Sequence, residues 1–227
     1  MTDETVRAIT DRVSTAWRST VVRKALVAVS GLALWAWVVL HVAGNLTLFS
    51  GPAAADGYAA ALRRAPAGLW AARVGLATAL VVHVAGVASL ARAGRAARPR
   101  HEPRRPRDTS AIAARGMRIG GTLLLAFVVY HLLHLTVGVL HPHFEPGRVY
   151  DNVVVGLRPP RIAAIYVGAA ALLGLHLLHG LWAAGRSLGI RPAAAGRRRR
   201  PAAAVLSVAI AAGFASVPIA VLAGWLR

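Results

Sequence analysis

Five long apolar stretches constrain this chain more than any other feature of its sequence. They run roughly over residues 24–49, 68–91, 117–140, 161–184 and 202–225. None has an acidic residue in its interior. Each holds about 20 or more residues, enough to cross ~30 Å of hydrocarbon, and lipid forces the backbone to bond internally, as a helix does. The sequence therefore predicts an all-α, single-domain integral membrane bundle of five transmembrane helices.

The composition agrees with a membrane protein and excludes several kinds of cofactor and catalytic chemistry. Hydrophobic residues make up 56% of the 227 residues, above the about 45–50% that is usual for soluble domains. The chain has no cysteine, which excludes disulfides, thiolate nucleophiles, cysteine-ligated iron–sulfur clusters and covalently attached haem. The first twenty residues are polar and lack the apolar core and cleavage site of a signal peptide, so none is expected.

The net charge of +19 would ordinarily suggest a nucleic-acid partner, but its distribution indicates membrane topology instead. Twenty of the 27 Lys and Arg residues fall in the tail up to Lys24 and in loops 92–118 and 186–200, all on one side of the bundle. The positive-inside rule then predicts a cytoplasmic N-terminus in a bacterial cytoplasmic membrane, with anionic lipid as counter-charge and no nucleic acid. Loop 95–108 is expected to be irregular, and segment 141–160 on the other side is long enough to cap a site.

Histidines stand out among the residues inside the apolar stretches. Six of the nine histidines lie there, on four helices: His41, His83, His131, His134, His176 and His179. Ionisable groups within a bilayer are costly and usually functional. Any one histidine alone reads equally well as a simple hydrogen-bond partner of a neighbouring helix, but four helices that each carry one favour a shared function.

Depth along the helices sorts four of these histidines into two pairs. His41 and His131 lie 17 and 13 residues beyond the basic residues that begin their helices, which is about 25 and 20 Å deep. His83 and His176 lie 9 and 10 residues before the basic residues that end theirs, about 14 and 15 Å deep. The sequence thus predicts an outer pair, His41 with His131, and an inner pair, His83 with His176.

Two stacked histidine pairs in a helical bundle suit two b-type haems, because each haem iron accepts an imidazole on both faces. Gly44 and Gly86 follow two of the histidines closely and would leave room for a porphyrin, although close helix packing explains each glycine equally well. Zinc or copper fits less well, since those ions favour one clustered shell of ligands, often with carboxylate or thiolate. His134 and His179 each follow a predicted ligand by three residues on the same helical face, and are either alternative ligands or groups that support the ligands.

Four short segments around these histidines carry a family resemblance. They are VLHVAGN (39–45), VHVAG (82–86), FVVYH (127–131) and HLLHGLW (176–182). In this order and spacing they resemble the membrane-anchor cytochrome b subunit of succinate dehydrogenase and fumarate reductase, in its single-chain form with five helices and two haems. The resemblance covers roughly residues 20–190. In that family the Gly-Leu-Trp ending at Trp182 follows the axial ligand by four residues, which favours His176 over His179, and the aromatic segment before the third-helix ligand favours His131 over His134.

The resemblance implies the rest of a respiratory complex. A flavoprotein subunit would oxidise succinate, and an iron–sulfur subunit would dock on the cytoplasmic face, with the basic loops as a docking surface. Electrons would pass through the inner and then the outer haem to a quinone, with menaquinone expected, so the chain alone would not act on succinate. Quinone reduction needs a proton donor near the outer haem. The polar candidates are Asp56, His141, His143 and Glu145, each of which also reads as a solvated loop residue.

The chain departs from the family at one position, and two alternative functions also fit its sequence. Some fumarate reductases of this family carry a glutamate two residues before the fourth-helix ligand for proton return, whereas this chain has Gly174, so no such proton path is expected. The chain reads alternatively as the cytochrome b anchor of another quinone-linked dehydrogenase, of hydrogenase or formate dehydrogenase type. A haem-free transporter that relays protons through its histidines is the alternative from a different class.

Overall fold

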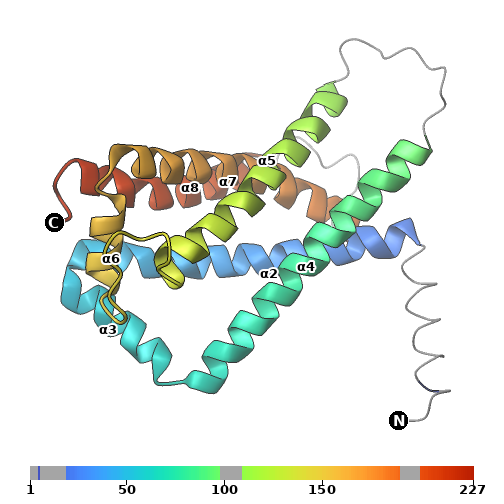
Figure 1. Cartoon of the computed structure of the whole chain (residues 1–227). Helices are drawn as coiled ribbons and strands as arrows, with labels where there is room; N and C mark the ends of the chain where they lie inside the picture. Colours follow the sequence, from blue (N-terminus) through green and yellow to red (C-terminus); the bar gives the residue numbers. More distant parts are fainter. Residues whose placement is uncertain (1–4, 6–18, 98–108, 190–199) are drawn as a thin grey trace.

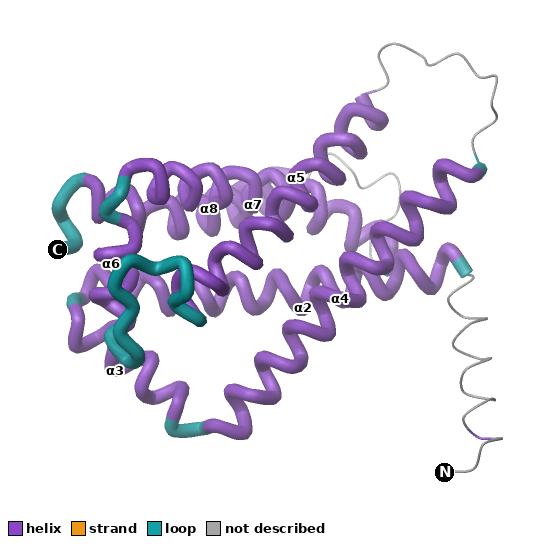
Figure 2. Tube along the Cα trace, viewed as in Figure 1, coloured by secondary structure: helices purple, strands orange, loops and turns teal. Residues whose placement is uncertain are grey.

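The structure, a computed structural model, describes residue 5 and residues 19–97, 109–189 and 200–227. These residues form seven α-helices and two short helical segments of other kinds, and no β-strand occurs among them (Figures 1 and 2). Five of the helices are long and apolar enough to cross a membrane. The prediction of an all-α bundle with five membrane-spanning helices is therefore confirmed.

The five long helices lie close to the predicted stretches. They are α2 (Thr20–Leu46), α4 (Pro66–Ala96), α5 (Thr109–His131), α7 (Pro160–Ser187) and α8 (Arg200–Leu222). A 3-10 segment, η1 (Thr47–Ser50), continues α2, and a π-helical segment, η2 (Leu132–Thr136), continues α5. Two shorter helices were not predicted: α3 (Pro52–Arg63) and α6 (Val149–Leu157).

Local sequence explains where several helices begin. Pro52, Pro66 and Pro160 each stand at the first position of a helix, where the missing N–H is not needed and the fixed φ is already helical. Helix α2 begins instead with a side-chain cap, because the Ser19 hydroxyl accepts a hydrogen bond from the Val22 N–H at 3.4 Å.

The third membrane helix ends earlier than predicted. The apolar pattern suggested a helix up to residue 140, but the helical backbone stops at Thr136. Gly138 has a φ of +86°, a left-handed conformation that glycine adopts readily, and the ring of Phe144 packs where a Cβ would stand. The chain therefore leaves the helix at Gly138, next to the Phe144 ring. Hydropathy alone does not predict this turn.

The bundle has two different ends (Figure 1). Helices α2, α5 and α8 begin, and α4 and α7 end, at one end, which we call the basic end because Lys24, Arg92 and Arg118 lie there. Helices α3 and α6 lie at the opposite end, which we call the capped end. Of the loop 95–108 that was expected to be irregular, residues 95 and 96 belong to α4, and residues 98–108 lie outside the described residues, as does most of the arginine run at 197–200.

Helix packing within the bundle is uneven. Helix α2 runs along α4, and α7 runs along α8 and also contacts α2 and α5. By contrast, α4 has little backbone contact with α7, and α5 has little with α2. Large apolar side chains such as Val81, Leu175 and Val208 are exposed on the outer faces, as expected where lipid takes the place of water.

The most tightly packed core lies at the capped end rather than at the centre of the bundle. Six of the nine residues of α6 are buried there, among side chains from η1, α3 and α8. Asp56 of α3 joins the two short helices, because its Oδ1 accepts a hydrogen bond from the Tyr150 N–H in the first turn of α6 at 3.0 Å. Segment 141–160, expected to be long enough to cap a site, thus supplies the helix that closes this end.

Replacing Gly86 with alanine should loosen the contact between α2 and α4. A Cβ at Gly86 would lie 2.5 Å from Val27 Cγ2, so the helices must separate. We expect the Gly86→Ala variant to lose about 1–3 kcal/mol of stability, measured by unfolding in detergent. Gly75→Ala on the same helix is the control, because nothing lies within 4 Å of its Cβ position, and equal losses in both variants would contradict the packing described here.

Candidate functional site

The inner pair forms between α4 and α7. The imidazole rings of His83 and His176 face one another with centroids 6.3 Å apart and planes at 66°. His83 Nδ1 donates a hydrogen bond to the Val27 carbonyl at 3.1 Å, and a carbonyl can only accept, so Nδ1 carries the proton. The unprotonated Nε2 of His83 then remains for a ligand, which is the arrangement seen in metal-binding histidines.

Two glycines lie against the rings of the inner pair. A Cβ at Gly31 on α2 would stand 3.1 Å from His83 Cε1, and a Cβ at Gly121 on α5 would stand 3.5 Å from His176 Cε1. Gly31 therefore leaves little room for a side chain beside His83, whereas a Cβ at Gly121 would make ordinary van der Waals contact with His176. Sequence reasoning missed both, although comparing the depths of glycines as well as histidines would have pointed to them.

The outer pair forms between α2 and α5. The rings of His41 and His131 have centroids 5.8 Å apart and planes at 74°. Aromatic side chains surround them: Trp37 stacks on His41, Phe127 stacks on His131, and Phe214 of α8 packs against His41. The outer pair is thus enclosed by rings from three helices.

The two pairs lie at two well-defined levels. Gly31 and His41 are ten residues apart on α2, and Gly121 and His131 are ten residues apart on α5. Because Gly31 and Gly121 contact the inner pair, both helices place the inner and outer levels about 15 Å apart. The structure therefore brings together the four histidines in the combinations that helix depth predicted.

The spacing within each pair fits two ligands of one metal. Two imidazoles bound to a metal from opposite faces by bonds of about 2.0–2.1 Å have ring centroids roughly 6 Å apart. The observed separations are 6.3 Å in the inner pair and 5.8 Å in the outer pair. In both cases the two helices that carry the paired histidines make little backbone contact, so side chains span the space between them. Among the described residues no three His, Asp or Glu side chains form one cluster, so the donor sets are pairs.

His134 and His179 lie apart from these pairs. His134 is 1% exposed, and its Nδ1 is hydrogen-bonded to the Tyr166 hydroxyl at 2.9 Å rather than directed at His41. His179 is exposed, and its Nδ1 donates to the Leu175 carbonyl of its own helix at 2.9 Å. The geometry therefore places His131 and His176, and not their neighbours, opposite the partner histidines.

The glycines proposed to make room for a porphyrin have other neighbours. A Cβ at Gly44 would meet the ring of Tyr58, and one at Gly86 would meet Val27. Both glycines thus allow close packing, the alternative that their sequence context left open. A Cβ at Gly174 would lie 2.9 Å from Ala211 Cβ, so a glutamate at this position would push α7 and α8 apart. Trp182 lies half-buried on α7, six residues beyond His176.

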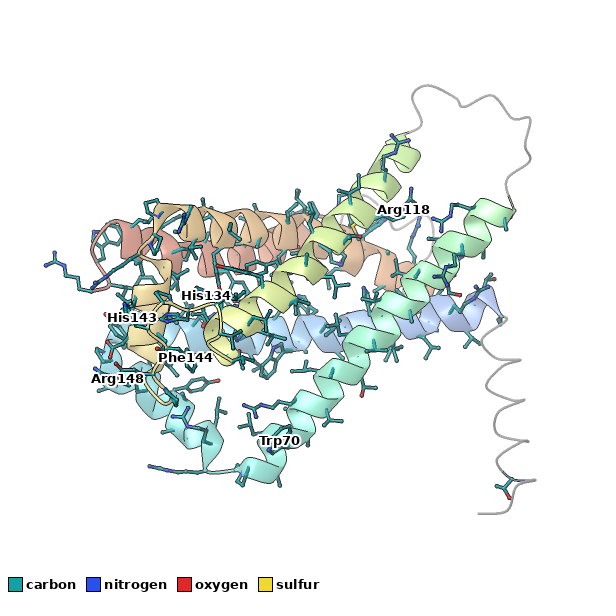
Figure 3. All side chains as sticks on the ribbon, in the orientation of Figure 1. Trp70, Arg118, His134, His143, Phe144 and Arg148 are labelled. Carbon is teal, nitrogen blue, oxygen red and sulfur yellow. The ribbon has the colours of Figure 1, made fainter. Side chains whose placement is uncertain are left out.

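The polar residues proposed to serve a quinone are largely engaged in holding the capped end together. His141 is buried: its Nε2 donates to the Asn152 carbonyl at 2.8 Å, and its Nδ1 accepts from the His143 N–H at 3.0 Å. Asp56 caps α6, as described above. Glu145 is exposed and pairs with Arg148, whose pKa is raised by Asp151 and by Glu145. Figure 3 shows His143, Phe144 and Arg148 at this end of the molecule.

A hollow of about 290 Å³ opens beside these residues at the capped end. Leu135 and Thr136 of η2 form one wall, Phe144 forms another, and Arg63 and Arg73 supply two guanidinium groups. Since η2 directly follows His131, the hollow lies next to the helix segment that carries the outer pair. None of the four predicted quinone residues lines it.

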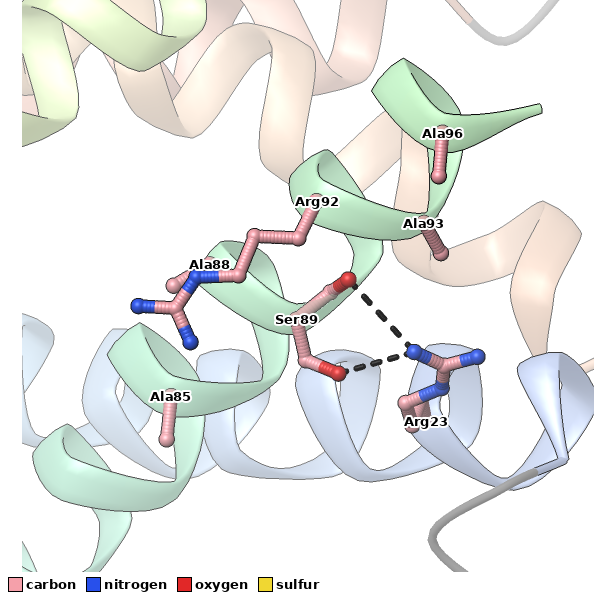
Figure 4. Close-up of a pocket in the computed structure, with 7 residues that line it drawn as sticks. All are labelled: Arg23, Ala85, Ala88, Ser89, Arg92, Ala93 and Ala96. Atoms are coloured by element: carbon pink, nitrogen blue, oxygen red, sulfur yellow. Dashed lines mark hydrogen bonds between the residues drawn. The ribbon is translucent and has the colours of Figure 1, made fainter.

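A second hollow, of about 600 Å³, lies at the basic end between the start of α2 and the end of α4 (Figure 4). Alanines form much of its wall, with Arg23, Ser89 and Arg92 as its polar residues. Arg23 Nη1 donates to the Ser89 hydroxyl at 2.8 Å and to the Ser89 carbonyl at 3.4 Å, which ties α2 to α4. Two cationic side chains thus lie beside an apolar surface where the bundle meets the headgroup region.

Comparisons with known proteins do not identify the chain: no family model, no curated protein and no solved structure matches it. The two histidine pairs are therefore the observations on which a functional proposal depends.

Substituting the two loop histidines should separate a structural role from a chemical one. His141→Ala removes a buried donor and acceptor and leaves the Asn152 carbonyl and the His143 N–H unpaired, so we expect a loss of about 1–3 kcal/mol in unfolding free energy. His143→Ala, whose side chain is exposed, is the matched control and should change stability by less than about 0.5 kcal/mol. Unfolding in detergent measures both, and equal stability of the two variants would contradict the structural role of His141.

Proposed function

We propose that this chain is the dihaem cytochrome b membrane anchor of a succinate:quinone oxidoreductase. The observation that supports this function is the presence of two cross-helix imidazole pairs, 5.8 and 6.3 Å apart between ring centroids, at two levels of one membrane bundle. Bis-histidine ligation of two b haems needs this combination of pairs. The resemblance of the histidine segments to the cytochrome b anchors favours succinate:quinone oxidoreductase over other quinone-linked dehydrogenases.

In this proposal each pair holds one iron porphyrin. His83 and His176 would ligate the inner haem, and His41 and His131 the outer haem. When bound, each haem supplies one-electron transfer, while the protein sets its position and surroundings. The hydrogen bond from His83 Nδ1 to Val27 fixes the ring so that Nε2 points away from the carbonyl. Gly31 keeps α2 clear of the His83 ring, and Gly121 of α5 lies against His176.

A haem-free proton relay fits the geometry less well. A relay needs polar groups in continuous contact across the membrane, but among the described residues no hydrogen bond joins the inner pair to the outer pair. The His83 proton is donated to a backbone carbonyl, which can pass it no further. Two separate pairs about 15 Å apart suit two separate cofactors better.

The basic end is the proposed docking side for the flavoprotein and iron–sulfur subunits. Arg23 and Arg92 line a hollow there, and cationic side chains at such an end attract both anionic lipid headgroups and acidic patches of a partner. This side is cytoplasmic in the proposal, in accord with the distribution of Lys and Arg.

The hollow at the capped end is the proposed quinone site. Leu135 and Phe144 offer apolar surface for a quinone ring, and Arg63 and Arg73 offer donors for its carbonyl oxygens. The hollow adjoins the helix segment that follows His131, so a quinone there would lie near the outer haem. This location replaces Asp56 and His141, whose polar atoms are already hydrogen-bonded to backbone groups.

Purified chain should contain two b haems, and histidine variants should remove them selectively. Because His83 is an inner ligand in the proposal, we expect His83→Ala to lose one of the two haems and leave the other. His179→Ala is the control, since His179 is exposed and bonded to its own helix, and should retain both. Haem content and a reduced-minus-oxidised spectrum measure the outcome, and a wild-type chain without haem absorbance would sink the proposed function.

Neutralising an arginine of the quinone hollow should weaken quinone binding. Arg63 lines the hollow and its neighbour Arg64 does not, so the two form a matched pair of exposed residues. In the assembled complex we expect Arg63→Gln to raise the KM for quinone roughly 2- to 10-fold, as loss of one hydrogen bond would, and Arg64→Gln to leave it unchanged. Equal effects of both variants would argue for a general charge effect and against this site.

A further inference from the structure

Tyr166 connects the two histidines at the end of α5. Its hydroxyl lies 2.9 Å from His134 Nδ1 and 3.4 Å from His131 Nδ1. Tyr166 belongs to α7, and its ring packs edge-on against Phe127 and beside both imidazoles. A single phenol from a neighbouring helix thus reaches both a predicted ligand and the buried histidine next to it.

The backbone of α5 is irregular at the same point. The π-helical segment begins directly after His131 and contains His134, and the Val137 N–H donates to the Leu132 carbonyl at 2.8 Å, five residues back. Short π segments interrupt α-helices frequently at functional sites. Here the irregular turn coincides with the place where both imidazoles meet the Tyr166 hydroxyl.

Proton counting fixes the direction of the two hydrogen bonds. A phenol has one O–H to donate and lone pairs with which to accept. If His131 Nε2 faces His41 across a metal, His131 Nδ1 carries a proton and must donate it to the Tyr166 oxygen. The Tyr166 O–H is then left to donate to His134 Nδ1, which accepts. His134 thereby becomes the acceptor that holds the tyrosine proton away from His131.

We infer that Tyr166 is a positioning residue for the outer pair: it accepts the Nδ1–H of His131 and is itself oriented by His134. This inference rests on the proposed function. A hydrogen bond from the distal nitrogen makes an axial imidazole a stronger electron donor and fixes its rotation about the metal bond. That donation would favour the oxidised, more positive iron, so Tyr166 would lower the potential of a haem held by the outer pair.

Tyr166→Phe in the full-length, haem-loaded chain tests this role, because it removes the hydroxyl and keeps the ring. We expect both haems to remain, the midpoint potential of the outer haem to rise, and that of the inner haem to stay unchanged. The outer haem is assigned as the one lost in His41→Ala. Tyr130→Phe is the matched control: the Tyr130 ring stacks on His134, but its hydroxyl bonds to neither histidine among the described residues, so neither potential should move.

A second variant tests the same role in case Tyr166→Phe does not fold. His134→Phe removes the acceptor of the tyrosine proton and leaves the bond from His131, so it should raise the outer potential in the same direction by a smaller amount. Unchanged potentials in Tyr166→Phe with both haems bound, or equal shifts in both haems, would overturn the positioning role and leave the proposed function standing. A wild-type chain that binds no haem would overturn the proposed function, and this inference with it.

Discussion

The structure is shaped by the need of imidazoles inside the membrane for partners to their polar atoms. Lipid offers none, so a ring there is stabilised by a carbonyl, a hydroxyl or a ligand. His83 meets this requirement with the Val27 carbonyl on one side, and His134 does so with Tyr166. His176 does not meet it: among the described residues its buried Nδ1 has no hydrogen-bond partner, so the inner pair leaves one polar atom unsatisfied.

Helix packing is uneven along the bundle and tightest at one end. Helices α4 and α5 each lie along one neighbour only, and the histidine pairs span the sides that the backbones leave apart. The capped end compensates: α6 is almost wholly buried there, and Asp56 and His141 bind the backbone of the capping segment.

Much of this arrangement follows from the sequence, and the rest does not for identifiable reasons. Helix depth needs only the rise per residue, so the pairing of His41 with His131 and of His83 with His176 could be predicted. The burial of His141 could not be predicted, because its hydrogen-bond partners, the Asn152 carbonyl and the His143 N–H, come together only when this short loop packs onto α6. The contacts of Gly31 and Gly121 were not predicted because each glycine lies against a histidine ring of a different helix. The end of α5 was misplaced because the chain turns at Gly138, within a stretch that is still apolar.

The equal spacing on α2 and α5 links fold to function most directly. Each of these helices lies against one histidine of the inner pair at a glycine and supplies a histidine of the outer pair ten residues later. The shared offset fits two helices that pass the same two levels of the bundle. Levels about 15 Å apart divide an apolar core of ~30 Å into halves, so two cofactors placed there would connect its two sides, whereas a single one would not.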